Sequence, residues 1–417
     1  MRKRRHDKYV CGDCFDDEGL RQFCARYAES HECDFCGETG SEPIAAPFDE
    51  VIRHINGCVH MHYDDPANAG LPYETAEGGY QGATYDTDEV LEALGLDFPR
   101  DKDDRLRNAV AEGLDNTLWS DAEPFALTSD QQLRFSWERF CRIIKHERRY
   151  FFLHDGEEKP PHYRDELLAP ARMLGMIFSF AEDAGAFVPL PAGSRIHRAR
   201  YQPGGEHYAT AGTLGPPPLS NAIQTNRMSP PGVVMMYASE DRDTALAETA
   251  NGPGTFALGE FAIERDLLIL DLTRLPPIPT PFAELPDAFE YDPRPRLRFL
   301  YDVSRDISRP IARDDRVHIE YVPTQVVTEY VRTAVRIDGR KVDGIRYRSS
   351  RESAKQALVL FADQSNLILE KPEQPEFYRE DQRWLRLVKA SLVKVKIEDM
   401  VRWRPEPRVL WFEDSFS

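Results

Sequence analysis

The stretch Arg227-Met-Ser-Pro-Pro-Gly-Val-Val-Met-Met-Tyr237, followed by Asp241 and by Thr244-Ala-Leu-Ala-Glu248, carries the most information about how this chain folds. Gly232 can adopt whatever backbone geometry a turn requires, so the Pro-Pro-Gly sequence predicts a turn. The apolar run after it is typical of a short buried strand that ends at Tyr237. Asp241 is a good residue to begin a helix, and the alanines that follow let that helix pack closely on a sheet. The sequence therefore predicts a turn, a strand and a helix that carry, in that order, an arginine, a tyrosine and a glutamate.

These residue types suit the binding and cleavage of a nucleotide. Arg227 can make bidentate, charge-assisted hydrogen bonds to a phosphate. Tyr237 offers a flat surface for stacking, worth on the order of 1–3 kcal/mol by analogy with base stacking. Glu248 can stabilise the positive charge that develops on a sugar when its glycosidic bond breaks. A carboxylate this close to a sheet should face a cleft or be paired, because unpaired burial is costly. Taken singly, each residue is more typical of a core aromatic or a surface charge, so only their order and surroundings make them informative.

The surrounding motifs resemble those of the RES domain family. In chain order they are Arg198 in a first strand, Arg227-Met-Ser-Pro-Pro-Gly232, Tyr237, Thr244-Ala-Leu-Ala-Glu248, the block His318-Ile-Glu-Tyr321-Val-Pro-Thr-Gln-Val-Val-Thr-Glu-Tyr330, and Gly344-Ile-Arg-Tyr347-Arg-Ser349. Their order, spacing and element types agree with the family from about Ser194 to Phe361. Met228 and Ser229 depart from the pattern, since many members have Trp and Asn there, which leaves one wall of the pocket undefined.

The resemblance implies an α+β fold class, with an ADP-ribosyltransferase-like split β-sheet domain that binds NAD as a substrate and cleaves its nicotinamide–ribose bond. It also implies a growth-arresting toxin or defence effector that is held by an antitoxin protein. In such a pocket Arg227 would bind the pyrophosphate, Tyr237 would stack on nicotinamide, and Glu248 would act on the ribose. Ser349 would orient the ribose or the leaving amide, and Arg198 would be a second anion contact. The sequence does not identify the group that accepts the ribose. Water as the acceptor would make the protein a glycohydrolase, phosphate would make it a phosphorylase, and a macromolecular group would make it an ADP-ribosyltransferase.

Four cysteines near the start of the chain have the spacing of a structural zinc site. They form Cys11-x-x-Cys14 and Cys33-x-x-Cys36, with 18 residues between the pairs. Two such knuckles let four thiolates close a tetrahedron around zinc at about 2.3 Å, with no open position for catalysis. Disulfides and a redox pair are the alternatives, but a cytosolic location argues against disulfides and the second knuckle favours a metal. We therefore expect one structural zinc ion per chain, and we expect Cys24 to be a small core residue on a helix between the pairs.

The chain is expected to comprise three segments: a zinc-knuckle segment at 1–45, a mainly α-helical domain at 46–188, and a RES-like domain with a C-terminal extension at 189–417. Helical periodicity dominates residues 48–182, and short strands begin with Arg195–Tyr201 after a linker-like break. The knuckles and the helices together resemble the HEPN/RES N-terminal domain that precedes longer RES domains. Residues 385–400 have the pattern of a strand or a helix.

Two other functions are compatible with the sequence. Arg139 and His146 are seven residues apart on a predicted helix, so they share a face and could polarise a phosphodiester as in HEPN-type ribonucleases. The same stretch is rich in basic residues, so a pair of this kind is nearly guaranteed. The other alternative is a non-catalytic zinc-ribbon adaptor that binds a protein or a nucleic acid through the four cysteines.

Composition narrows the classes of function further. The 417 residues carry a net charge of −18, which disfavours a protein that coats nucleic acid but allows a small anion in a locally basic pocket. No apolar run approaches the ~18 residues of a membrane span, and the N-terminal Met-Arg-Lys-Arg-Arg is not followed by the apolar region of a signal peptide. A cytoplasmic location is therefore expected. The sequence has no P-loop and no Gly-x-Gly-x-x-Gly fingerprint, which disfavours ATP use and Rossmann redox chemistry. An antitoxin protein and further copies of the chain are the candidate macromolecular partners.

Overall fold

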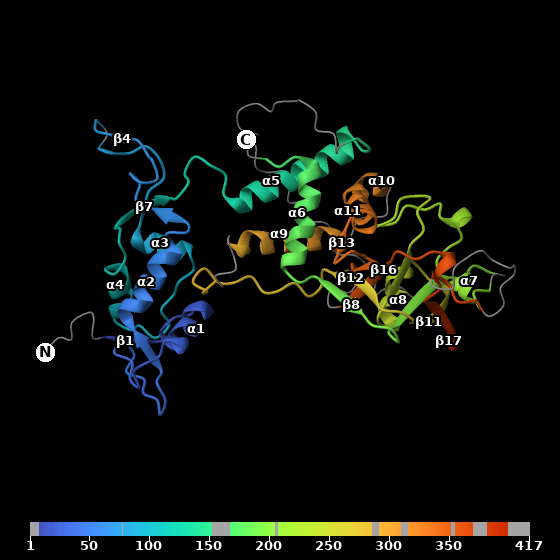
Figure 1. The fold of residues 1–417 in the computed structure, drawn as a ribbon, viewed down its shortest axis with the longest axis horizontal. Coiled ribbons are helices and arrows are strands. Elements are labelled where there is room, and N and C mark those ends of the chain that lie inside the picture. Colours follow the sequence, from blue (N-terminus) through green and yellow to red (C-terminus); the bar gives the residue numbers. More distant parts are fainter. Residues whose placement is uncertain are drawn as a thin grey trace. The chain divides into compact units, whose positions relative to one another are not determined.

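The computed structural model describes residues 8–76, 78–151, 167–204, 207–285, 292–309, 316–351, 355–369 and 382–398. The basic residues at the N-terminus and Met400 lie outside these ranges. The chain divides into two compact units, each made of two pieces: Met1–Gln132 with Pro277–Arg296, and Leu133–Pro276 with Leu297–Ser417 (Figure 1). The boundaries of these units differ from those of the predicted segments, which are 1–45, 46–188 and 189–417.

The first unit is mainly helical and holds small pairs of strands. β1 (Tyr9–Cys11) pairs antiparallel with β2 (Ala45–Pro47). The other elements are η2 (Gly12–Cys14), α1 (Glu18–Arg26), α2 (Phe48–Val59), β3 (Tyr63–Asp64), β4 (Tyr73–Glu74), β5 (Gly79–Tyr80), β6 (Tyr85–Asp86), α3 (Thr87–Ala93), α4 (Arg105–Ala111) and β7 (Leu118–Asp121). Their apolar faces meet in a core that contains Phe15, Phe48 and Trp119, all fully buried. Cys24 is fully buried in the same core, as expected.

The second unit is built on one eight-stranded sheet of order β17-β11-β9-β10-β16-β15-β12-β8. Its strands are β8 (Phe187–Leu190), β9 (Arg195–Tyr201), β10 (Met236–Ser239), β11 (Gly254–Ile263), β12 (Leu267–Asp271), β15 (Gly344–Arg348), β16 (Gln356–Leu360) and β17 (Leu385–Ile397). β12 and β15 are parallel, whereas the other neighbouring strands of the sheet are antiparallel. The predicted α+β class is confirmed, with a helical N-terminal part and a large mixed sheet in the C-terminal part.

The two faces of this sheet carry different side chains, because successive residues of a strand point to opposite sides. On one face, here called the helix-covered face, Tyr237, Tyr347 and Val359 pack with helices. Those helices are α5 (Ser129–Arg142), α6 (Pro170–Asp183), α9 (Pro293–Ser308) and α11 (Val322–Thr333). On the opposite face, Met236 and Leu358 pack in a second core that includes residues of α7 (Ala211–Leu214).

The remaining elements of this unit are short. They are a π-helical turn (Ile143–Glu147), η4 (Leu219–Asn221), α8 (Arg242–Thr249), α10 (Val317–Glu320), η5 (Gln364–Asn366) and the hairpin of β13 (Arg336–Ile337) and β14 (Arg340–Lys341). The predicted strand at Arg195–Tyr201 is β9, and the predicted helix around Glu248 is α8. Within the described residues, no helix has the length and apolar character needed to cross a membrane.

The predicted strand that ends at Tyr237 is displaced toward the C-terminus. β10 begins at Met236 and continues to Ser239, whereas Val234 and Met235 are buried without belonging to a strand. The turn predicted at Gly232 is present, with φ of +87° at that glycine, and the Val233 N–H donates to the carbonyl of Pro230 at 3.1 Å. The chain therefore enters the sheet only after it has left the turn.

Residues 385–397 of the C-terminal extension form a strand. β17 pairs with β11 from Gly254 to Ile263, with a bulge between Leu258 and Glu260. These described residues thus form an edge strand of the eight-stranded sheet.

Candidate functional site

Glu248 and Ser349, which the sequence placed in one pocket, are in direct contact. Oε1 of Glu248 accepts a hydrogen bond from Oγ of Ser349 and another from the Ser350 N–H at 3.0 Å. Glu248 lies in α8, which Asp241 begins by accepting the Thr244 N–H at 2.9 Å, while Ser349 follows β15 and is 4% exposed. The carboxylate is therefore paired, as expected for a partly buried group close to a sheet.

Tyr237 is fixed at both its ring and its hydroxyl. Its ring lies on the helix-covered face, and its hydroxyl oxygen accepts the Met228 N–H at 3.2 Å and lies 3.0 Å from Oγ of Ser229. Burial raises the pKa of the Tyr237 phenol to about 12, so the hydroxyl is neutral near pH 7. Ser229, at a position where the sequence departs from the family pattern, is therefore a hydrogen-bond partner of the tyrosine.

Arg227 is half-buried and is held by groups from other elements. Its Nη1 donates to the carbonyl of Ile307 at 2.8 Å and to that of Arg309 at 2.5 Å. Its guanidinium carbon lies 5.7 Å from the centre of the Tyr321 ring. These contacts leave Nε and Nη2 without a hydrogen-bond partner in the part of the chain that the structure describes.

Tyr347 connects these groups. It is 3% exposed, and its pKa is raised well above the usual value by burial and, after that, by the nearby charge of Glu248. Arg227, Tyr237 and Tyr321 also act on it electrostatically. Glu248, Arg227 and Tyr237 therefore all influence the pKa of the Tyr347 phenol. The sequence predicted no role for Tyr321 or Tyr347, and the only signal for either was its place in a motif, His318–Tyr330 for the first and Gly344–Ser349 for the second.

Arg198 is not brought to this group. Strand alternation places it with Ile196 on the opposite face of the sheet from Tyr237. Its Nε donates to the carbonyl of Leu214 at 2.8 Å, its Nη1 donates to the carbonyl of Tyr237 at 2.5 Å, and burial lowers its pKa to about 10. Two of the donor groups of Arg198 thus bind backbone carbonyls, and its predicted role as a second anion contact stays a prediction.

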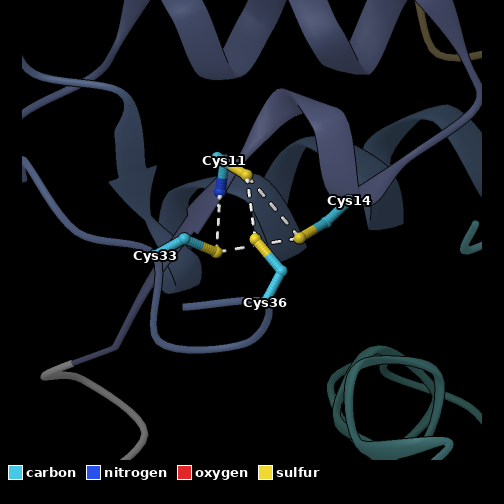
Figure 2. A group of neighbouring side chains, drawn as sticks. All are labelled: Cys11, Cys14, Cys33 and Cys36. Carbon is cyan, nitrogen blue, oxygen red and sulfur yellow. Dashed lines mark hydrogen bonds between the residues drawn. The ribbon is translucent and has the colours of Figure 1, made fainter. Parts of the chain in front are cut away.

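The four predicted metal ligands converge in the first unit (Figure 2). The Sγ of Cys11 lies 3.7 Å from that of Cys14 and 3.6 Å from that of Cys36, and the Sγ atoms of Cys14 and Cys33 are 3.7 Å apart. A tetrahedron with Zn–S bonds of about 2.3 Å has edges of about 3.8 Å, so the spacing fits zinc. The spacing is too long for a disulfide, whose sulfur atoms are about 2.05 Å apart. All four ligand atoms lie within 4.8 Å of one another, so the set can close around an ion without an open position.

The alternative ribonuclease pair is separated by a change of helix type. Arg139 lies in α5, whereas His146 lies in the π-helical turn Ile143–Glu147 and is exposed. A π-turn uses i→i+5 hydrogen bonds, so residues seven apart no longer share the face that α-helical geometry gives them. The structure records no hydrogen bond or ion pair between these two described residues.

Residues 194–385 match the model of the RES domain, and residues 26–158 match HEPN/RES N-terminal domain 1. By these matches the chain resembles RES-domain proteins. Its RES domain includes Arg198, Arg227, Tyr237, Glu248 and Ser349. At the level of the family, a RES domain implies an NAD-related, toxin-like activity. No match to the chain was found among curated proteins.

Proposed function

We propose that this chain cleaves the nicotinamide–ribose bond of NAD. The observation that carries the proposal is the pairing of Glu248 with Ser349, and the contact of the Tyr237 hydroxyl with Met228 and Ser229 beside Arg227 supports it. Glu248 lies in α8, Ser349 follows β15, Arg227 lies in a loop and Tyr237 lies in β10.

Glu248 is arranged to stabilise positive charge. One of its oxygens, Oε1, is held by Ser349 and by the Ser350 N–H, whereas Oε2 has no hydrogen-bond partner among the described residues. A carboxylate fixed through one oxygen can present the other to ribose hydroxyls and to an oxocarbenium-like transition state. When the bond between ribose and the ring nitrogen breaks, its electron pair leaves with nicotinamide, which departs as a neutral molecule.

Arg227 supplies the binding surface for the pyrophosphate of NAD, and Tyr237 supplies the one for its nicotinamide ring. The free edge of Arg227, formed by Nε and Nη2, has the bidentate geometry that suits a pyrophosphate oxygen pair. The hydroxyl of Tyr237 is engaged by Ser229 and Met228, so the ring keeps one orientation and can stack on nicotinamide. For Arg198 we propose a positioning role, through its bond to the Tyr237 carbonyl.

The acceptor of the ribose decides which reaction follows. Water yields ADP-ribose and a proton, phosphate yields ADP-ribose 1″-phosphate, and a side chain or nucleic acid would retain the ADP-ribosyl group. The test is to incubate the purified chain with NAD, with and without phosphate, and to identify the products by mass spectrometry. A glycohydrolase should release nicotinamide under both conditions, whereas a phosphorylase should release it only with phosphate, together with a phosphorylated product. Absence of nicotinamide release under both conditions would contradict the proposal.

We further propose that the chain is a cytoplasmic toxin restrained by an antitoxin, which follows from the family-level activity. Expression of the chain in a bacterial host should lower cellular NAD and arrest growth, and Glu248→Gln should do neither. Growth arrest that persists in Glu248→Gln with intact NAD and cleaved RNA would instead favour the pair Arg139 and His146.

We also propose one structural zinc ion at Cys11, Cys14, Cys33 and Cys36. The four thiolates are soft donors, which zinc prefers in closed tetrahedral sites. A zinc ion here would contribute to the folding of the first unit rather than to the chemistry of the RES domain. Metal analysis of the purified chain should find about one zinc per chain, and a metal-free yet fully stable protein would contradict this assignment.

A further inference from the structure

We propose that Tyr321, Gln325 and the end of α9 preset the guanidinium of Arg227 for binding the pyrophosphate. This group, here called the Arg227 cradle, consists of the carbonyls of Ile307 and Arg309, the ring of Tyr321 and the side-chain amide of Gln325. The inference rests on the proposed function, because the pyrophosphate is that of NAD.

The first part of the cradle is the end of a helix. Nη1 of Arg227 donates to the carbonyls of Ile307, in the last turn of α9, and of Arg309, just beyond it. The last carbonyls of a helix lack intrahelical partners and carry partial negative charge, so they favour a cation. A guanidinium is planar, with five donors in a rigid fork. Fixing Nη1 therefore also fixes the direction in which the free edge points.

The second part restrains the plane of the guanidinium. Its central carbon lies 5.7 Å from the centre of the Tyr321 ring, within the range of a cation–π contact. Tyr321 lies in the turn between α10 and α11 and is 8% exposed, so its ring has little freedom to move away. The contact uses the ring and not the hydroxyl, which makes phenylalanine an adequate replacement.

The third part holds the backbone that leads into the arginine. Nε2 of Gln325, in α11, donates to Oγ1 of Thr225 at 2.9 Å and to the carbonyl of Asn226 at 2.8 Å. The Asn226 N–H in turn donates to the carbonyl of Ser229 at 2.9 Å, which closes the loop around Arg227. The cradle therefore restrains both the backbone at Arg227 and its guanidinium. The side chain loses its conformational entropy on folding, so NAD binding does not have to offset that loss.

The test is a double-mutant cycle on kcat/KM for NAD. Tyr321→Leu should lower kcat/KM about five- to thirtyfold, mainly through KM, because cation–π contacts of this kind are worth that factor. Tyr321→Phe should stay within about twofold of the wild type. In an Arg227→Ala background, Tyr321→Leu should lower kcat/KM little further, since Tyr321 acts on binding only through the arginine. Gln325→Met should behave like Tyr321→Leu, and it decides the question if Tyr321→Leu does not fold.

The outcomes separate the cradle from the proposed function. If the wild-type chain releases no nicotinamide from NAD, the proposed function is wrong, and so is the proposed role of the Arg227 cradle. An active wild type in which Tyr321→Leu and Gln325→Met are both unaffected overturns the cradle alone. An equal loss from these changes with and without Arg227 overturns it as well, because the effect would then be general.

In the first unit, we infer that two described pieces of the chain, residues 277–285 and 292–296, lock the metal-binding knuckles. These pieces, here called the strap, lie inside the RES match yet belong to the first unit. Its Phe282 is fully buried in the core of that unit, and its carbonyl lies 2.8 Å from Nε2 of His54. Arg294 is 1% exposed and joins the two pieces of the strap by donating to the carbonyl of Pro281 at 2.6 Å.

The strap reaches the first knuckle through one aspartate. Oγ1 of Thr280 donates to Oδ1 of Asp17 at 3.0 Å and accepts the Gly19 N–H at 3.2 Å. Asp17 also begins α1 by accepting the Leu20 N–H at 2.9 Å, and it lies three residues after Cys14. Loss of the strap would thus free the start of the helix that follows the first knuckle, and the knuckle would hold its ion less firmly.

The measurement is the rate at which the intact chain releases zinc to a chromogenic chelator. Gly19→Ala would place a Cβ 2.4 Å from the backbone nitrogen of Ala283, so it should displace the strap and speed release by about tenfold or more. Thr280→Val should act in the same direction, and it decides the question if Gly19→Ala does not fold. Gly57→Ala is the matched control, since nothing lies within 4 Å of the added Cβ. Release at the wild-type rate in both strap variants, or a wild type without zinc, overturns the inference.

Discussion

Oγ of Ser349 donates a hydrogen bond to Oε1 of Glu248, although the two residues are 101 positions apart in the chain. One residue follows a strand of the sheet and the other lies in a helix packed beside it. Because the Ser350 N–H binds the same oxygen, the carboxylate is fixed from the β15 side and keeps its second oxygen for a ligand. This pairing gives the RES domain a defined anion.

Removal of the serine hydroxyl should impair cleavage of NAD. Ser349→Ala deletes one hydrogen bond to a charged group, worth about 1.5–3 kcal/mol, so kcat/KM should fall about 10- to 150-fold. Ser350→Ala is the matched control, because it keeps the N–H that binds Glu248, and it should remain close to the wild type. Steady-state assays of nicotinamide release compare the two. Equal damage from both serines would contradict the assigned role of Ser349.

Replacement of Arg198 should cost stability more than substrate binding. Arg198→Met removes bonds to the carbonyls of Leu214 and Tyr237, and we expect the free energy of unfolding to fall by about 1.5–3 kcal/mol. Arg195→Met is the control on the same strand, since that arginine is exposed and its loss should change stability by less than about 0.5 kcal/mol. Urea titrations measure both. A KM for NAD that rises as much in Arg198→Met as in Arg227→Met would restore Arg198 as an anion contact.

The Tyr237 phenol should make stability depend on pH above pH 10. Its pKa is raised by burial to about 12, against about 10 in an unfolded chain. The folded state therefore favours the neutral phenol, and this contribution is complete below pH 10 and is lost as the pH rises toward 12. Tyr237→Phe should flatten the decline in the urea midpoint over this window relative to the wild type. Tyr150→Phe, which changes an exposed tyrosine, should not. An identical decline in all three proteins would contradict the burial of the phenol.

Loss of one metal ligand should abolish zinc retention. Cys14→Ser removes a buried thiolate from the tetrahedron, so the purified variant should contain almost no zinc and the first unit should be sensitive to protease. Cys24→Ala is the control, because that cysteine is buried in the same core outside the ligand set, and it should retain about one zinc per chain. Metal analysis of the two purified variants measures the zinc content of each. Equal zinc in the two variants would show that Cys14 is not a ligand.

The sequence could predict those parts of the site whose chemistry is local. The spacing of Cys11, Cys14, Cys33 and Cys36 specifies a tetrahedral set, and the structure brings these thiols together. The helix around Glu248 and the turn at Gly232 depend on neighbouring residues and were found where expected.

Other features depend on contacts between distant residues, which leave no local pattern. The burial of Phe282 in the first unit follows from partners more than 200 residues earlier, such as His54 at a separation of 228. The contact of Arg227 with the end of α9 spans 80 residues and gives no periodicity. Alternation along β9 could place Arg198 and Ile196 on one face, but only the packed structure shows that Tyr237 uses the other.

The most direct test of the central claim is the release of nicotinamide from NAD by three purified proteins: the wild type, Glu248→Gln and Asp243→Asn. Asp243 lies on the same helix as Glu248, is exposed, and matches the change in charge. We predict that the wild type and Asp243→Asn release nicotinamide at similar rates, and that Glu248→Gln is slower by about 100-fold or more. Release by Glu248→Gln at the wild-type rate, or no release by the wild type, would contradict the account.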